Sequence, residues 1–256
     1  MVTAAVMRSF AKEGILQVAT GDRYREEAIT SIERIRPFLS GRPVTLVTDK
    51  PERIPSGIFD SVIVHRQPKM SYRDKILPLI HLPYKRTLFL DTDLELLAPI
   101  DDIFQILRSV DLLGCHAPVR WCDWKSDEVP EGFCELNSGV LGMRRGSRQR
   151  AMVRYWLKLY DKVGIQFDQA TLRASLWWAM RERGLRTWVL PSEYNLRTPK
   201  PWLTGAGMEV KILHGRVPEE KRKLLHNYLN DNVENFRSSS VFPTGQNQQI
   251  HPFLPE

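Results

Sequence analysis

The chain has 256 residues, 42% of them hydrophobic and 26% charged, a composition typical of a soluble globular protein and a length that suits one large α/β domain or two small ones. No apolar run approaches the roughly 20 residues of a membrane-spanning helix, the first residues do not resemble a secretory leader, and three cysteines without a CxxC pair argue against a disulfide framework, so we expect a cytoplasmic protein. The net charge of +7 favours an anionic substrate or membrane surface, and because no recognisable nucleic-acid motif accompanies it, we expect no nucleic-acid partner.

The first part of the chain alternates apolar runs with a helical pattern. Residues 14–19 predict a buried strand, and residues 22–39 carry apolar side chains at helical spacing. Residues 43–48 and 59–64 predict two further strands. Strand, helix and strand at this spacing indicate βαβ units and a parallel sheet, in which ligands bind beyond the carboxyl ends of the strands.

A helical pattern at 70–82 leads to an apolar strand, 87–90, that ends on Asp91 and Asp93. Side chains of an extended segment alternate between faces, so these two carboxylates point the same way. Their mutual repulsion would be relieved by a divalent cation, and hard oxygen ligands favour Mg²⁺ or Mn²⁺. The alternative interpretation is a solvated turn, because Asp is common after strands.

The rest of the chain predicts one continuous domain over 1–236 and a flexible tail over 237–256, with no internal repeat and no interdomain linker. A long irregular loop at 117–136 is a candidate for acceptor recognition, because long loops in compact domains are often functional. The other predicted elements are a helix ending near 107, strands at 111–115, 138–143, 186–190 and 210–213, and helices at about 147–162, 168–183 and 217–230.

Several short motifs follow one another in a set order. They are Val18-Ala19-Thr20 with Tyr24, Lys75 before Leu77-Pro78, the run 86–93, Leu136-Asn137-Ser138-Gly139-Val140, Asp168-Gln169, Leu190-Pro191 with Tyr194-Asn195, and Ile212-Leu213-His214-Gly215. In this order and spacing, the set resembles GT-A fold glycosyltransferases of the glycosyltransferase family 8 type, the group that contains glycogenin and bacterial lipopolysaccharide galactosyltransferases. The resemblance extends from about Leu16 to Gly215.

The resemblance implies an α/β fold with a mixed, mostly parallel central sheet flanked by helices. It also implies a nucleotide-sugar donor, usually a UDP-sugar, with Mn²⁺ (or Mg²⁺), and transfer of a hexose with retention to a hydroxyl group of a saccharide, glycolipid or protein acceptor. By this resemblance Asp91, Asp93 and His214 are metal ligands, and Asn137, Asp168 and Gln169 form the catalytic sugar pocket. The residues expected to contact the donor are Thr20, Tyr24, Lys75, Thr92, Gly215 and Arg216.

Most of these residues also have an ordinary structural interpretation. His214 could be a hydrogen-bonded structural histidine, and Asn137 could belong to a turn. Asp168 could cap the helix that follows it, because Asp is a favoured N-cap. Thr20 and Tyr24 could cap and pack the first helix, and Lys75 could be an exposed helix residue.

The segment after His214 departs from the family pattern. The family continues with glycine, two spacers and a Lys-Pro-Trp run, whereas this chain reads Gly215-Arg216-Val217-Pro218 and lacks that lysine. Arg216, or a residue of 221–223, is the candidate substitute, because arginine binds phosphate well.

Two alternatives to a transferase are kept. A nucleotidyltransferase that makes nucleotide sugars would usually carry a glycine-rich basic loop after the first strand, but residues 20–24 contain one glycine. A catalytically inactive nucleotide-sugar-binding protein would tolerate the altered segment after His214. The basic net charge also leaves open a peripheral association with a membrane.

Overall fold

The computed structural model describes residues 11–117, 124–197 and 209–222, and all structural statements below concern these residues. A large sheet of seven strands forms the centre of the molecule, in the order β3-β2-β1-β4-β7-β6-β8. Its strands are β1 Glu13–Ala19, β2 Val44–Thr48, β3 Ser61–Val64, β4 Arg86–Leu90, β6 Leu112–His116, β7 Leu136–Arg144 and β8 Thr187–Leu190.

The large sheet is mixed and mostly parallel, as the sequence predicts. Strands β3, β2, β1 and β4 run parallel to one another, and β8 runs parallel to β6. Only β7, of the strands described, is antiparallel to its neighbours β4 and β6. The start of β7 therefore lies beside the end of β4, which brings Asn137, Ser138 and Gly139 next to the carboxylates at 91 and 93.

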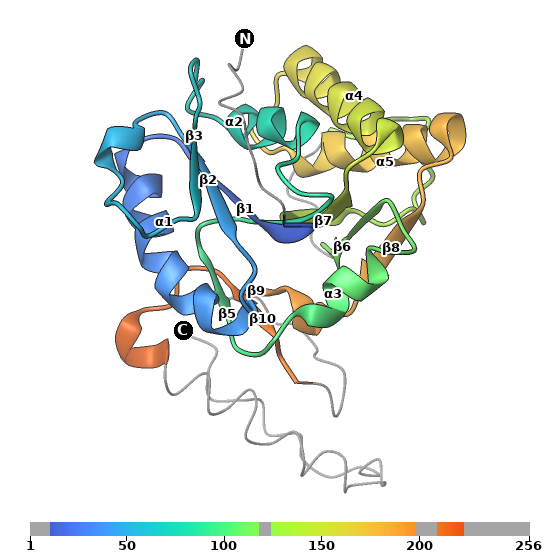
Figure 1. Ribbon diagram of the computed structural model, residues 1–256. Helices are drawn as coiled ribbons and strands as arrows, with labels where there is room; N and C mark the ends of the chain where they lie inside the picture. The colour runs from blue at the N-terminus through green and yellow to red at the C-terminus, as the bar shows by residue number, and fades with distance from the viewer. Residues whose placement is uncertain (1–10, 118–123, 198–208, 223–256) are drawn as a thin grey trace, which may run out of the picture.

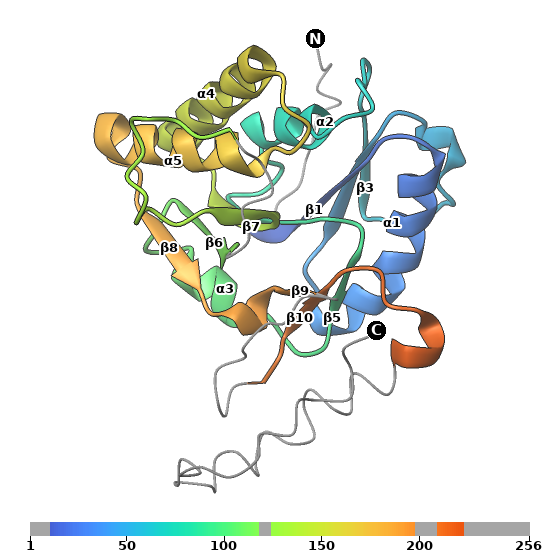
Figure 2. The same cartoon turned by 180° about the vertical axis from the view of Figure 1, so that it is seen from behind.

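Helices cover both faces of this sheet (Figures 1 and 2). On one face lie α2 Arg73–Ile76, α4 Ser147–Val163 and α5 Gln169–Arg183, together with the 3₁₀ turn Leu77–Ile80. On the other face lie α1 Asp22–Ile35 and α3 Asp101–Ile106. Alternate residues of one strand supply the two cores: Leu88 and Leu90 face α1, whereas Phe89 faces α4 and α5.

A small second sheet, which the sequence did not predict as a unit, packs on the α1 side of the large one (Figure 1). It consists of β5 Leu94–Leu96, β10 Ile212–His214 and β9 Leu196–Arg197, with β10 antiparallel to β5 and parallel to β9. Strands of two and three residues give too little alternation to be read from sequence. The tripeptide Asp91–Asp93 connects the two sheets between β4 and β5, and residues 191–195 connect them again between β8 and β9.

Two predicted helices are shorter in the structure. The helix predicted at 22–39 ends at Ile35 and continues as the 3₁₀ turn Arg36–Phe38, where Pro37 lacks an N–H donor. The helix predicted at 70–82 is the single turn Arg73–Ile76 followed by the 3₁₀ turn Leu77–Ile80, which contains Pro78. The remaining 3₁₀ turns are Pro51–Arg53 and Ser192–Tyr194.

Some predictions fall outside the described residues. These are most of the helix at 217–230, of which 219–222 are helical, the tail at 237–256, Lys223, and residues 118–123 of the long loop.

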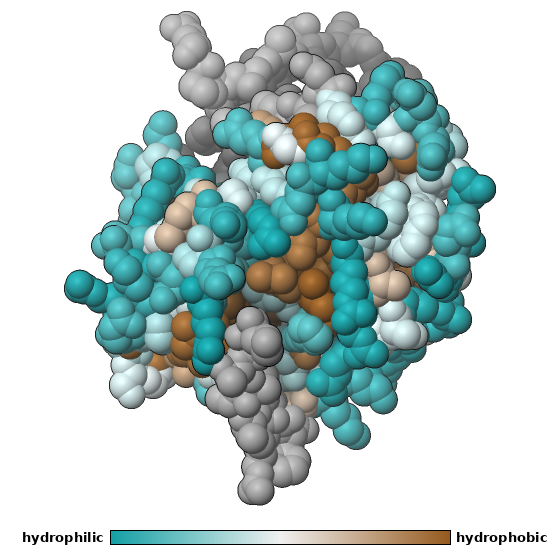
Figure 3. All heavy atoms as spheres, turned by 90° about the horizontal axis from the view of Figure 1, so that it is seen from above, coloured by the Kyte–Doolittle hydropathy of each residue, from teal (hydrophilic) through white to brown (hydrophobic). Residues whose placement is uncertain are grey.

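The face that carries α2 and α4 is mainly hydrophilic, with a hydrophobic strip near its centre (Figure 3). None of the helices in the described ranges combines the length and hydrophobicity that crossing a bilayer requires.

Candidate functional site

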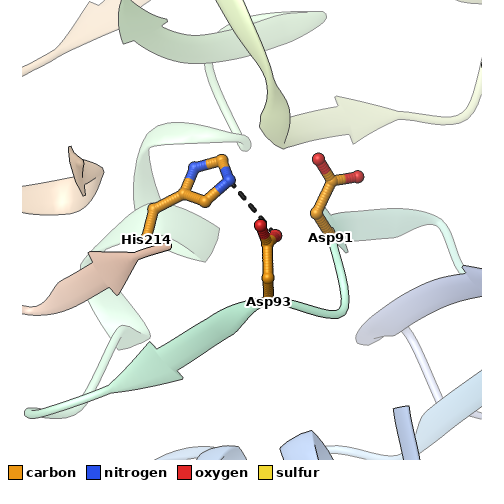
Figure 4. Close-up of side chains that lie close together, drawn as sticks. All are labelled: Asp91, Asp93 and His214. Atoms are coloured by element: carbon orange, nitrogen blue, oxygen red, sulfur yellow. Dashed lines mark ion pairs between the residues drawn. The ribbon is translucent and has the colours of Figure 1, made fainter. Parts of the chain in front are cut away.

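Asp91, Asp93 and His214 form a compact cluster of potential metal ligands. One ligand atom from each lies within 4.8 Å of the others. Nε2 of His214 is 3.3 Å from Oδ1 of Asp93, and the three side chains point toward a common centre (Figure 4). His214 is 3% exposed, so the ring is held inside the protein with one nitrogen at the cluster. The structure therefore brings the distant histidine beside the two carboxylates.

The backbone around the cluster fixes where each ligand starts. The N–H of Asp91 donates to the carbonyl of Gly139 on β7 (2.9 Å), and the N–H of Gly215 donates to the carbonyl of Asp93 (3.0 Å). In the small sheet, His214 pairs with Leu94, the residue after Asp93. The three ligands therefore come from the ends of β4, β5 and β10, and strand pairing sets their spacing.

Gly139 allows β7 to pass close to this cluster. A Cβ atom at this position would lie 2.6 Å from Cε1 of His214 and 2.7 Å from Oδ2 of Asp91. Both distances are shorter than ordinary van der Waals contact, so any other residue would displace two of the three ligands. Glycine is required here by space, since the backbone approaches the ligands directly.

The two carboxylates differ electrostatically. Burial raises the pKa of Asp93, but the hydrogen bond and charge of His214, together with Arg216, outweigh it and hold that pKa well below its usual range. For Asp91, burial and the nearby Asp93 raise the pKa more than Lys75 and His214 lower it. Asp91 is thus a carboxylate with insufficient compensating charge, which a divalent cation would provide.

Lys75 lies between Asp91 and Asp168 and is not the exposed helix residue of the alternative interpretation. Its Nζ is 3.4 Å from both oxygens of Asp91 and 3.4 Å from Oδ2 of Asp168, and it donates to the hydroxyl of Ser138 at 2.9 Å. Burial lowers the pKa of Lys75, but the carboxylates of Asp168 and Asp91 raise it by a larger amount. The pKa is therefore above its usual value, and the ammonium group stays charged. The lysine links the candidate metal site to the predicted sugar pocket.

Asp168 occupies the N-cap position of α5, but its side chain makes no capping hydrogen bond. Its carboxylate is 2% exposed and accepts from the Ser138 hydroxyl (2.9 Å), while Oδ2 accepts no hydrogen bond within the described ranges. The capping interpretation is therefore wrong for the carboxylate, which is directed to the Lys75 side.

Asn137 and Gln169 are joined in a buried amide network. Nδ2 of Asn137 donates to Oε1 of Gln169 (2.6 Å), whose Nε2 donates to Glu135 (3.2 Å). On the other side, Oδ1 of Asn137 accepts from Nδ2 of Asn195 (2.9 Å), and Oδ1 of Asn195 lies 2.7 Å from Nδ1 of His214. The predicted sugar-pocket amides and the histidine ligand are therefore parts of one network.

Arg216 borders the cluster on the side away from Lys75. Its Nη1 is 3.4 Å from Oδ2 of Asp93, and its Nε donates to Glu27 on α1 at 2.7 Å. The hydroxyl of Thr92 donates to the same carboxylate. Gly215 has φ +131°, which a side chain would disfavour, and this bend returns the chain toward Asp93. Arg222 instead pairs with Glu95 and Glu219, and so is already engaged elsewhere.

Thr20 and Tyr24 follow the carboxyl end of β1. The Thr20 hydroxyl donates to Asp74 (2.9 Å) and does not cap α1, whereas the Tyr24 ring is 46% exposed and available for stacking. Nearby, Asp49 accepts from the backbone N–H of Gly21 (3.1 Å) and pairs with Arg25. These groups form a polar edge at the ends of β1 and β2.

Sequence reasoning did not assign roles to four residues of this site: Glu27, Glu135, Ser138 and Asn195. Ser138 and Asn195 stand inside the quoted motifs, so their neighbours in sequence were the available signal. Glu27 and Glu135 carried none, because a glutamate in a helix or a loop is ordinarily a solvated side chain.

Comparison with known proteins supports the fold. A crystal structure of an active-site mutant of LgtC, a galactosyltransferase of family 8, superposes with a TM-score of 0.57 at 12% sequence identity, covering 91% of this chain and 98% of that one. No protein-family model and no curated protein sequence matches the chain. The chain therefore has the GT-A glycosyltransferase fold, as the sequence motifs predict.

Proposed function

We propose that this protein is a metal-dependent glycosyltransferase that moves a hexose from a UDP-sugar to a hydroxyl group of an acceptor, with retention of anomeric configuration. The GT-A fold and the likeness to LgtC support the class, and the family 8 resemblance supports the donor and the stereochemistry. The observation that carries the proposal is the Asp91, Asp93 and His214 cluster at the carboxyl end of β4, where ligands of parallel sheets bind.

The charges around the cluster fit a cation with a diphosphate. Two carboxylates and an imidazole provide oxygen and nitrogen ligands that suit Mn²⁺. Lys75 on one flank and Arg216 on the other place a positive charge 3.4 Å from each carboxylate. Phosphate oxygens that complete the coordination of a cation here would meet both positive side chains.

A bound divalent cation would supply Lewis-acid stabilisation of the negative charge that develops on the departing diphosphate. Arg216, fixed by Glu27, binds the diphosphate on the side where the family lysine is missing. Lys75 stays protonated and adds positive charge at the boundary between the diphosphate and the sugar. Thr92 and Gly215 position this flank, the first through Glu27 and the second through its backbone bend.

The sugar lies, in this proposal, against Asn137, Asp168 and Gln169. Oδ2 of Asp168, which has the Lys75 ammonium at 3.4 Å, can accept a hydrogen bond from a sugar hydroxyl, and the Gln169 amide stands near the oxocarbenium-like centre. Tyr24 stacks on the nucleobase, with Thr20 at the same edge. The acceptor is a saccharide, glycolipid or protein, approached from the side of the 117–136 loop.

A donor screen tests the proposal. Thermal shift of the purified chain with nucleotide sugars and Mn²⁺ should give stabilisation by a UDP-sugar that depends on the metal, together with slow release of UDP. Asp91→Asn with Asp93→Asn should abolish the metal-linked shift. The control, Asp127→Asn with Asp161→Asn, removes two exposed carboxylates outside the site and should leave the shift unchanged.

Neither stabilisation nor hydrolysis with any nucleotide sugar would contradict the transferase function. Binding without hydrolysis or transfer would favour a nucleotide-sugar-binding protein. Formation of a nucleotide sugar from a nucleoside triphosphate and a sugar phosphate would favour a nucleotidyltransferase.

A further inference from the structure

A continuous chain of hydrogen bonds runs from Glu135 to the candidate metal site. It passes through three buried amides and ends on the imidazole of His214. Every member is at most 7% exposed, so water does not compete for these bonds. In such a chain each amide has one oxygen and one nitrogen, and fixing the direction of one bond fixes all the others.

Two groups whose hydrogen-bonding role is unambiguous fix the direction of the hydrogen bonds in this chain, and both give the same direction. At one end, the Glu135 carboxylate accepts, so Gln169 must present its Nε2 to it and its Oε1 to Asn137. Independently, the backbone N–H of Gly139 donates to Oδ1 of Asn137 at 3.0 Å. A backbone N–H can only donate, so Oδ1 of Asn137 is the acceptor atom and Asn195 must donate Nδ2 to it.

The same donor-to-acceptor direction determines which nitrogen of the His214 ring carries the hydrogen. With Nδ2 of Asn195 directed at Asn137, its Oδ1 faces Nδ1 of His214 at 2.7 Å and accepts a hydrogen bond from the Nδ1–H group. We infer that Asn195 is a positioning residue that holds neutral His214 in the Nδ1–H tautomer, which leaves the lone pair of Nε2 directed at the carboxylate cluster. The role of this tautomer in metal binding rests on the proposed function. The tautomer itself follows from hydrogen bonds within the protein and does not require a bound metal.

This arrangement resembles the way in which a neighbouring acceptor supports a histidine that binds a metal ion. A histidine ligand usually donates its other ring N–H to an acceptor, which orients the ring and makes the coordinating nitrogen more basic. Here the acceptor is an amide whose own orientation depends on Asn137 and Gln169. The residues proposed to contact the sugar therefore also set the polarity of the third metal ligand.

The test compares two substitutions of Asn195 by calorimetry with Mn²⁺ alone. Asn195→Leu removes both hydrogen bonds at similar size, and Mn²⁺ affinity should fall by about 10- to 100-fold. Asn195→Asp keeps an acceptor for Nδ1–H but turns its second oxygen toward Oδ1 of Asn137, so it should recover only part of that loss. Circular dichroism checks that both variants are folded. Unchanged affinity in the Leu variant overturns the inference.

A second measurement does not depend on metal binding. Nitrogen-15 NMR of the metal-free protein, with His214 neutral, should give a protonated Nδ1 and an unprotonated Nε2 in the wild type, and loss of this preference in Asn195→Leu. A wild-type ring protonated on Nε2 alone, with Asp93 as the acceptor in place of Asn195, overturns the inference. Absence of Mn²⁺ binding by the wild type would contradict the proposed function, and the tautomer measured by NMR would still decide this one.

Discussion

At the scale of single residues, the site depends on how closely the main chain of β7 approaches the ligands. Gly139→Ala would place a Cβ within 2.7 Å of atoms of both His214 and Asp91. Overpacking of this kind costs about 1–3 kcal/mol, so we expect Mn²⁺ affinity to fall by about 5- to 150-fold, as followed by calorimetry. Gly132→Ala is the matched control, because a Cβ there meets nothing within 4 Å. Equal affinities for the two variants would contradict a steric role for Gly139.

A substitution of Arg216 should separate the binding of Mn²⁺ from the binding of the diphosphate. Arg216→Met removes a cation beside Asp93, so affinity for Mn²⁺ alone should stay the same or rise. Affinity for UDP in the presence of Mn²⁺ should fall by about tenfold or more, because a charge-assisted hydrogen bond to phosphate contributes about 1.5–3 kcal/mol.

Arg36→Met is the control for this change, since Arg36 pairs with Asp60 on the surface at the far end of α1. Isothermal titration with Mn²⁺ and then with UDP measures both affinities. A parallel loss of Mn²⁺ and UDP binding would indicate that Arg216 supports the fold of the cluster and does not contact the diphosphate.

At the scale of elements, one carboxylate joins the ends of three strands and the start of a helix. Asp111, just before β6, pairs with Arg144 at the end of β7, with Arg148 in α4, and with Arg186 before β8. Burial raises the pKa of Asp111, but the hydrogen bonds of Arg144 and Arg186 outweigh it and hold that pKa below its ordinary value of 3.8.

The sign of the pH dependence follows from this lowered pKa. The ion pairs stabilise the fold fully above the pKa of the unfolded chain, and this stabilisation is lost as pH falls through the folded pKa. Asp111→Asn should therefore lower the free energy of unfolding by about 1–3 kcal/mol near pH 7, with the difference shrinking below about pH 4. Urea unfolding at several pH values measures it, with exposed Asp127→Asn as the control. A difference that is constant with pH would assign the effect to packing.

The elements also mark what the sequence could predict. Long periodic segments such as α4 and α5, and buried strands such as β1, β2 and β4, were predicted close to their observed ends. The small sheet was missed, because β5 and β9 are too short for a pattern and are stabilised by pairing with β10. For the site, motifs indicated which residues gather, and the GT-A fold agrees. Motifs could not indicate that Asp168 faces Lys75 and not its own helix, since that depends on tertiary packing.

At the scale of the whole molecule, the two hydrophobic cores lie on opposite faces of one sheet and share its strands. Loss of the helices on either face would expose apolar side chains of strands whose alternate residues form the core of the other face. One face of the small sheet adds Leu94, Leu96 and Ile212 to the core on the α1 side, whereas its other face has only a minor cluster, which contains Leu196, Val210 and Leu213. Regions with few buried apolar contacts open at lower free energy than the main core.

The candidate metal ligands belong to both sheets, because the segment Asp91–Asp93 connects β4 of the large sheet to β5 of the small one. Asp91 ends a strand of the large sheet, whereas Asp93 and His214 sit at the ends of strands in the small one. A cation held by all three residues would link the large sheet to the small sheet. Mn²⁺ should therefore slow amide hydrogen exchange in β5 and β10 more than in β2 and β3, as mass spectrometry can measure; uniform slowing would contradict this. Metal loading would then govern how readily the small sheet opens locally, as well as whether the donor binds.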